Sequence, residues 1–133
     1  VAVRTNTYQD TDEVPAKSEA CVAAGKDPIV KVKYDTQDQA VTAVLLGQAD
    51  AFSADSPVTA YAVKKADGEL KPAGPQYDAA PYGYPVRKGA PLAAALQAAV
   101  QYVIDQGYFR TIAEHWGVQD GMIENSVING ASE

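Results

Sequence analysis

The chain has 133 residues, of which 47% are hydrophobic and 21% charged, and its formal net charge is −6. This is enough for one domain with a modest core and is an ordinary composition for a globular protein. Lysine and arginine are scattered along the chain, so we expect no nucleic-acid partner. No run of apolar residues reaches the roughly 18 that a membrane span needs. Arg4 and the nearby acidic residues exclude an opening signal peptide, so we expect a mature form or a piece of a longer chain.

The first part of the chain alternates predicted strands and helices. A strand is expected over Val1 to Arg4. A helix follows it up to Ala24, and Gly25 ends that helix. Pro15 is tolerable only near the first turn of this helix, because proline lacks an N–H group. The alternating pattern of 29–34 predicts a second strand.

The same alternation continues to the middle of the chain. Thr36 and Gln39 match a capping box at the start of a helix that Gly47 ends. A short strand is predicted over 49–54, and the pair Ser56-Pro57 follows it as N-cap and first helical residue. The order of strands and helices predicts an α/β fold class with a mainly parallel open sheet and flanking helices.

The last part of the chain is different. Residues 68–84 are rich in proline and glycine and predict a connector, with a strand over 84–87. Two C-terminal helices follow. The first starts near Pro91 and ends before Gly107, the second runs over 109–116 and is closed by Gly117, and a loop-like tail begins at Val118. The helices carry apolar faces, and the tail carries three apolar docking points. The faces consist of Leu92, Leu96, Val100, Val103, Ile104, Phe109, Ile112 and Trp116, and the docking points are Met122, Ile123 and Ile128.

The sequence gives little support for catalysis. It holds one histidine, His115, and one cysteine, Cys21, with no nucleophile motif and no metal-ligand spacing. We expect His115 to be structural or solvent-exposed and Cys21 to be a small buried hydrophobic residue rather than a reactive thiol. We therefore predict no catalytic residue, no metal site and no cofactor.

Two places suggest ligand binding. The first is the strand-to-helix turn from Arg4 to Gln9. A helix start presents free backbone N–H groups and the positive end of a dipole, which bind anions such as a carboxylate. Asn6 can adopt a positive φ there, and Thr7 and Gln9 add side-chain donors. The alternative is an ordinary capped loop.

The second place is Asp55, which follows the strand predicted over 49–54. Ligands of open parallel sheets bind beyond the carboxyl ends of the strands. A carboxylate at this position could hold an ammonium group. The alternative is that Asp55 caps its own helix. We expect Asp55 and the backbone of 7–9 to lie at one edge of the sheet, where they would complement a zwitterion.

Several segments together resemble the family-3 extracellular solute-binding proteins, the polar-amino-acid receptors of ABC importers. The resemblance rests on the order and spacing of segments along nearly the whole chain, and the ending from Gly117 to Gly130 is similar to actinobacterial members. The most specific segments are GQADAFSADSP, YGYPVRKG and DQGYFRTIAEHWGV. They lie within an ordered series of five segments: VAVRTNTYQ, CVAAGK, YDTQDQAVTAVLLGQADAFSADSPVTAYAVKK, YDAAPYGYPVRKGAPL and VIDQGYFRTIAEHWGV.

This resemblance implies a lobe of the periplasmic-binding-protein type II fold, followed by two C-terminal helices. Residues 1–81 would be the second, ligand-binding lobe, incomplete at its N-terminus. Residues 82–133 would be the return crossover strand and the helices that pack on a first lobe, most of which is missing here. Tyr82 and Gly83 would form the hinge, and the lobes of such proteins close on their ligand.

The resemblance also implies roles for single residues. Arg4 stands where some members place a basic or polar ligand contact. Residues Thr7, Tyr8 and Gln9 match the turn that receives the ligand's carboxylate and side chain, and Asp55 matches the acidic residue that binds the α-ammonium. The sequence departs from the family at Asn6, where glycine is usual, and at Tyr8, where threonine, glycine or valine is common. The arginine that clamps the ligand's carboxylate belongs to the missing lobe.

The function that the resemblance implies is a receptor that captures an amino acid between two lobes and delivers it to an ABC permease in the membrane. The location would be extracellular or periplasmic, with a lipoprotein anchor on the full-length form. One alternative is a ligand-sensing domain of a receptor or regulator, and another is an enzyme such as a dehydratase. The sequence leaves open which amino acid is bound. Because the helix faces would lack their lobe, we expect the chain to self-associate through them, or to fold them onto its own sheet.

Overall fold

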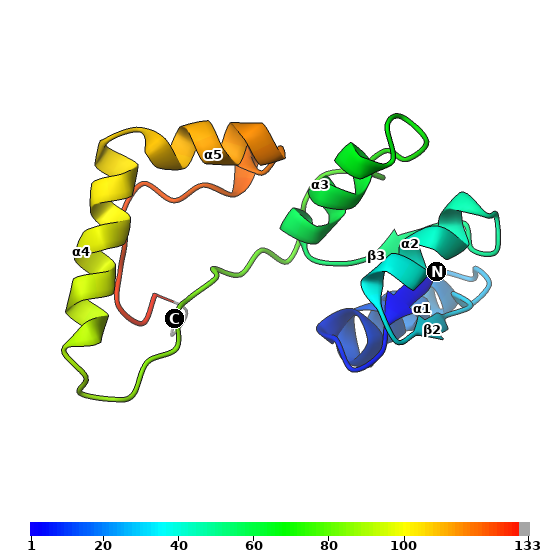
Figure 1. Cartoon of the computed structure of the whole chain (residues 1–133). Helices are drawn as coiled ribbons and strands as arrows, with labels where there is room; N and C mark the ends of the chain where they lie inside the picture. Colours follow the sequence, from blue (N-terminus) through cyan, green and yellow to red (C-terminus); the bar gives the residue numbers. More distant parts are fainter. Residues whose placement is uncertain (131–133) are drawn as a thin grey trace. The chain divides into compact units, whose positions relative to one another are not determined.

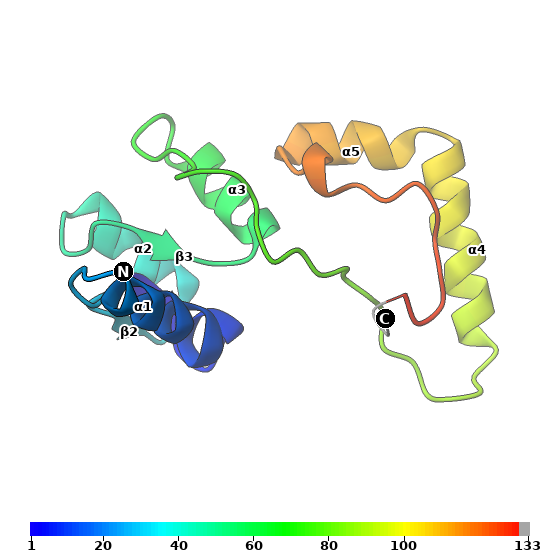
Figure 2. The same cartoon turned by 180° about the vertical axis from the view of Figure 1, so that it is seen from behind.

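The computed structural model describes residues 1–130. The chain divides into two compact units, Val1–Pro72 and Ala73–Glu133, here called unit 1 and unit 2. Unit 1 holds every strand of the described residues, and unit 2 holds the two C-terminal helices, as Figures 1 and 2 show from opposite sides. The predicted boundary between 1–81 and 82–133 concerns the lobes of a larger protein and remains a prediction.

Unit 1 is built on a small parallel sheet, which confirms the predicted α/β class. Its central strand, β1 (Ala2–Arg4), pairs with β2 (Val32–Tyr34) on one side and with β3 (Phe52–Ser53) on the other. Ala2 lies opposite both Val32 and Phe52. The outer strands are shorter than predicted. The reason is that β1 has only three residues with which they can form parallel ladders.

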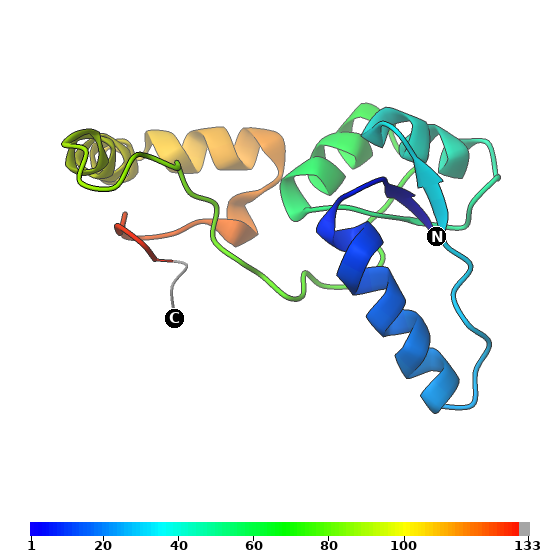
Figure 3. The same ribbon diagram turned by 90° about the horizontal axis from the view of Figure 1, so that it is seen from below.

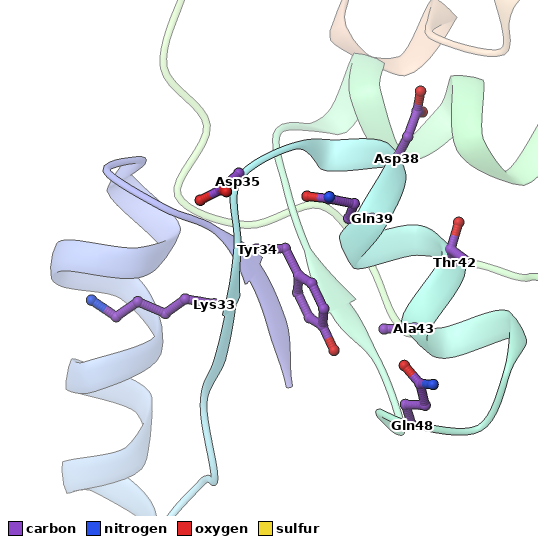
Figure 4. A pocket seen from close by; sticks show the side chains of 8 residues that line it. All are labelled: Lys33, Tyr34, Asp35, Asp38, Gln39, Thr42, Ala43 and Gln48. Carbon is purple, nitrogen blue, oxygen red and sulfur yellow. The ribbon is translucent and has the colours of Figure 1, made fainter.

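Three helices accompany this sheet: α1 (Val14–Ala23), α2 (Gln37–Leu45) and α3 (Ser56–Lys65). In Figures 3 and 4, α1 and α2 lie on opposite sides of the strands. The core between α2 and β1 consists of small side chains, because Ala40 is 0%, Ala43 2% and Val3 0% exposed. Small residues allow the helix to approach the sheet closely. Adding or removing a single methylene group there should therefore change the stability of the fold.

The starts of α2 and α3 differ. The predicted capping box of α2 is confirmed: Gln39 N–H donates to Thr36 Oγ1 at 3.2 Å, and Thr36 N–H donates to Gln39 Oε1 at 3.1 Å. The prediction that Ser56 caps α3 is wrong by one residue. Asp55 holds the N-cap position, and its side chain makes no capping hydrogen bond. The carboxylate of Asp55 bonds elsewhere, as described below.

A wide helical turn precedes α1 and was not predicted. Residues Gln9–Glu13 form a π-helical turn, η1, in which the Val14 N–H donates to the carbonyl of Gln9, five residues back. Such turns are rare. Pro15 is the second residue of α1, in the first turn of the helix, where its missing N–H does not interrupt the helical hydrogen bonds. Gly25, at φ 72°, follows the end of α1 as predicted.

Unit 2 consists of α4 (Leu92–Asp105), α5 (Tyr108–Trp116) and the short 3₁₀ turn η2 (Gln119–Gly121). The two predicted C-terminal helices are confirmed. Gly107, at φ 75°, separates them and Gly117, at φ 71°, ends the second. The strand predicted over 84–87 is wrong. A strand exists only through hydrogen bonds to a neighbour, and no described residue pairs with this segment. Tyr82 is 70% exposed in this irregular stretch.

The tail of unit 2 docks on α4 by polar contacts. Ser126 N–H donates to Gln101 Oε1 at 2.8 Å, and Gln97 Nε2 donates to the Ser126 carbonyl at 3.0 Å. Of the three predicted apolar docking points, Met122 is half-buried, whereas Ile123 and Ile128 are exposed. The glutamines of α4, rather than those isoleucines, therefore hold the tail.

Unit 2 buries little apolar surface. Ala113 is its one hydrophobic residue in the buried class among the described residues, while Leu92, Ile112 and Trp116 are 54%, 54% and 43% exposed.

Cys21, in unit 1, is only half-buried, so the prediction of a buried cysteine is wrong. None of the described helices combines the length and the apolar character that a membrane crossing requires.

Candidate functional site

The candidate site begins where β1 ends. Thr5 anchors the strand end to β2, since its N–H and its hydroxyl both donate to the Tyr34 carbonyl, at 2.8 and 3.0 Å. Asn6 then adopts a φ of 60°, the left-handed conformation that was predicted for it. The hydroxyl of Thr7 donates to the Arg4 carbonyl at 2.7 Å and closes the turn. The turn from Arg4 to Gln9 is therefore a defined structure rather than a loose loop.

The helix start supplies the anion-binding feature of the site. The N–H groups of Asp10 and Thr11 both donate to the Thr7 carbonyl at 3.0 Å. The N–H groups before the first such bond of a helix have no carbonyl partner within it, and they lie at the positive end of the helix dipole. The Thr7 hydroxyl, by contrast, was predicted to offer a donor to a ligand. Its proton is already used within the turn.

Asp55 and Gln9 meet at the same edge of the sheet. Because β1 and β3 are parallel, their carboxyl ends lie side by side, and Gln9 Nε2 donates to Asp55 Oδ1 at 2.8 Å. The prediction that Asp55 and the 7–9 segment share one edge is thus confirmed. Gln9 is 7% exposed while Asp55 is exposed, so the buried amide fixes one oxygen of a carboxylate that solvent can reach.

Two buried carboxylates lie behind this edge, those of Asp10 and Glu13. Glu13 Oε1 accepts a hydrogen bond from Ser53 Oγ, in β3, at 2.8 Å. Asp10 is 2% exposed, and its Oδ1 lies 2.9 Å from Lys31 Nζ and 3.1 Å from Lys33 Nζ. The turn η1 therefore joins the site to both outer strands.

Sequence reasoning missed these polar contacts. The available signal was the spacing of Gln9, Asp10 and Glu13, which places three polar side chains on one side of a helical turn. Their burial depends on partners far away in the sequence, such as Lys31 and Ser53.

The charge state of Asp10 follows from its partners. The hydrogen bond from Lys31 lowers the pKa of this carboxyl most, and the Asn6 N–H, 3.1 Å from Oδ2, lowers it next. Burial raises the pKa, and Lys33 lowers it further. Together they move the pKa from 3.8 to about 2, so Asp10 is an anion at neutral pH.

Arg4 and Tyr8, which were predicted to contact a ligand, flank the turn. Both are exposed, and Tyr8 has 57% of its surface accessible. Tyr82 and Gly83, which were predicted as the hinge, belong to unit 2, and their role remains a prediction. Within residues 1–130, no three histidine, cysteine or acidic side chains come together in a way that could hold a metal ion.

A separate hollow of about 490 Å³ lies between β2 and α2. It exists because β2 is an outer strand and α2 overhangs it (Figure 4). Its lining is polar and mostly exposed, with Ala43 its one buried member, so it lacks the buried polar groups of a specific site. The lining residues are Lys33, Tyr34, Asp35, Asp38, Gln39, Thr42, Ala43 and Gln48. None of them is a predicted site residue.

The arrangement at the sheet edge matches one kind of molecule. A helix start with free N–H groups receives a carboxylate, and a carboxylate such as that of Asp55 receives an ammonium group. Both features lie on the same edge, joined by Gln9. An α-amino acid carries both charges on adjacent groups, which makes it the simplest ligand that fits.

The comparison with known proteins agrees with this chemistry. Over 129 residues the chain is 41% identical to the arginine-binding protein ArgT of Corynebacterium glutamicum. The match covers 97% of this chain and 42% of the relative, so the chain spans less than half of that protein's length. The predicted resemblance to an amino-acid-binding protein is confirmed. No protein-family model matches the chain, and no solved structure matches it.

Proposed function

We propose that this chain, a relative of an arginine-binding protein, is the ligand-receiving part of a solute-binding component of an ABC importer. The observation that carries the proposal is the contact between Gln9 and Asp55 at the carboxyl edge of the sheet, 2.8 Å long. It holds an exposed carboxylate beside a helix start. The relationship over 129 residues to a protein named for binding an amino acid supports the same conclusion.

In this proposal each group at the edge has one task. Asp55 accepts the α-ammonium of the ligand, and the N–H groups of Thr7 to Gln9 receive its carboxylate. Arg4 and Tyr8 contact the rest of the molecule. Tight sites cover most of their ligand. An edge that leaves Tyr8 57% exposed does not do so alone, and a facing lobe would complete the cleft.

L-Arginine is the first ligand to test. The name of the relative suggests it, and a net charge of −6 favours the approach of a cation. We propose a binding protein and not an enzyme, because the relative is named for binding and because Asp10 and Glu13, the buried acids behind Asp55, are already engaged in an ion pair and a hydrogen bond within the protein. The relative also favours a receptor over a ligand-sensing domain of a regulator.

The wider arrangement belongs to the same proposal. Residues 1–81 would form most of one lobe, and 82–133 would form the return crossover and two helices that pack on the other lobe, with Tyr82 and Gly83 as the hinge. The receptor would hand its amino acid to a membrane permease from an extracellular or periplasmic position, with a lipoprotein anchor on the full-length form. Without the other lobe, the chain would associate with itself through α4 and α5.

A hybrid protein tests the proposal. The matching segment of ArgT is replaced by this chain, and L-arginine binding is measured by calorimetry. We expect binding, and we expect Asp55→Ala to weaken it by about 2–5 kcal/mol, because the ammonium would lose its partner. Asp12→Ala, at an exposed acid of η1, is the matched control and should keep the affinity. A folded hybrid that binds no amino acid, or that binds equally well after Asp55→Ala, would overturn the proposal.

A further inference from the structure

The turn that receives the proposed carboxylate has a costly conformation at its centre. Asn6 stands at φ 60°, in the left-handed region that residues other than glycine adopt at some cost. Asparagine tolerates this region better than most residues, but it does not require it. Something in the surrounding structure must therefore select this conformation and keep it before a ligand arrives.

One buried side chain makes the required contact. Asp10 Oδ2 accepts the Asn6 N–H at 3.1 Å, from four residues further along the chain. The other oxygen of this carboxylate lies 2.9 Å from Lys31 Nζ and 3.1 Å from Lys33 Nζ, on the segment of the outer strand β2. Lys31 Nζ also donates to the Asp10 carbonyl at 2.5 Å. The carboxylate is thus fixed from one side by lysines and holds the turn with the other.

The charge of Asp10 is compensated without using the site. A buried carboxylate is tolerated when it is paired and hydrogen-bonded, and the two lysines and the Asn6 N–H satisfy that condition. Because the Asn6 N–H donates to Asp10, it does not compete with the N–H groups of the following residues for a ligand's carboxylate.

We infer that Asp10, held by Lys31 and Lys33, is a positioning residue that fixes Asn6 in the left-handed conformation and so shapes the anion-receiving turn. This inference rests on the proposed function for its effect on a ligand. Its effect on the turn itself does not depend on any ligand. Asp10 would not touch the amino acid, and it would act entirely through Asn6.

The test uses the 133-residue chain, labelled for NMR, and four forms: wild type, Asp10→Ala, Asp10→Ala with Asn6→Gly, and Asp12→Ala. The first measurement is the intraresidue NOE between the amide and α protons of residue 6, which is strong at a positive φ, together with hydrogen exchange of that amide. We expect Asp10→Ala to weaken the NOE and speed the exchange. Asp12→Ala, an exposed acid in the same turn, should change neither.

The second measurement is the affinity for L-arginine from the initial slope of the amide shifts. Asp10→Ala should weaken binding about five- to thirty-fold, the factor that corresponds to the usual cost of a left-handed residue. Adding Asn6→Gly should restore part of the affinity, because glycine adopts a positive φ readily. If Asp10 had only a structural role, a glycine at position 6 would not restore the affinity that Asp10→Ala removes.

The outcomes separate the two proposals. If the hybrid with ArgT binds no L-arginine but the NOE of residue 6 depends on Asp10, the proposed function fails and the positioning of the turn stands. If the wild type binds and a folded Asp10→Ala chain keeps both the NOE and the affinity, the positioning role is wrong. Circular dichroism identifies any variant that does not fold. For such a variant, Asp10→Asn, which keeps the size of the side chain and removes its charge, takes its place in both measurements.

Discussion

Unit 1 and unit 2 differ in the side chains that they bury. In unit 1, polar residues of η1 are buried and joined to both outer strands, as Gln9 to Asp55 and Asp10 to Lys31 show. In unit 2, apolar residues such as Ile112 and Trp116 remain about half-exposed, and the tail is held by glutamines. Unit 1 therefore has a polar framework around its candidate site, whereas unit 2 leaves large apolar side chains exposed, and we propose that these form a contact with a second copy of the chain.

The largest effect is expected from substitutions that break the proposed self-association through α4 and α5. Burying one large apolar side chain contributes about 1.5–3 kcal/mol, so replacing both Ile112 and Trp116 by glutamate should weaken self-association by about two to four orders of magnitude. Light scattering over a dilution series measures this. Val30→Glu, at a 75% exposed position of unit 1, is the control and should leave association unchanged. A wild-type chain that is monomeric at every concentration would contradict the prediction.

A second substitution sharpens the comparison through the cores. Val3 in β1 is 0% exposed. Replacing it by alanine should lower the free energy of unfolding by about 2 kcal/mol, because the substitution removes two methyl groups from a packed site. Val127, 63% exposed in unit 2, should lose less than about 0.5 kcal/mol on the same change. Denaturant unfolding of the two variants gives both values. Equal losses would show that the two valines are not packed as described.

A third, smaller effect concerns the helix starts of unit 1. Thr36→Ala removes the capping box of α2 and should cost about 1 kcal/mol. Ser56→Ala should cost little, because Asp55 and not Ser56 holds the N-cap position of α3. Thermal unfolding compares the two. If Ser56→Ala is the more damaging change, the assignment of the α3 start is wrong.

The last expected effect is in the acid dependence of unit 1, where a single carboxylate changes its charge. The pKa of Asp10 is lowered on folding from 3.8 to about 2. A lowered carboxyl pKa stabilises the fold fully above pH 3.8, and this contribution is lost as the pH falls through about 2. Unfolding free energies measured between these pH values should therefore fall with pH more steeply in the wild type than in Asp10→Asn. Identical slopes would show that Asp10 is not paired as described.

Sequence reasoning succeeded where the cause is local or follows from parallel topology. The capping box at Thr36 and the left-handed glycines at Gly107 and Gly117 depend on a few neighbouring residues. The meeting of Gln9 and Asp55, 46 residues apart, was predictable because the carboxyl ends of adjacent parallel strands share one edge.

Sequence reasoning failed where the burial or pairing of a residue depends on a partner far away in the sequence. The burial of Asp10 depends on Lys31, which lies 21 residues further along the chain. The strand predicted over 84–87 lacks a neighbour among the described residues, and an alternating pattern cannot supply one. The wide turn η1 also escaped prediction. Gln9 and Glu13 of this turn bond to Asp55 and Ser53, which lie 46 and 40 residues further along the chain.

Titration of the labelled 133-residue chain with L-arginine, followed by NMR, tests the location of the site most directly. We expect shifts confined to Thr7, Tyr8, Gln9 and Asp55. We also expect a dissociation constant of about 1 mM or weaker, near 4 kcal/mol, because this edge alone leaves most of a ligand in water. Shifts centred on the hollow between β2 and α2, or on unit 2, with none at Asp55, would contradict this location of the site.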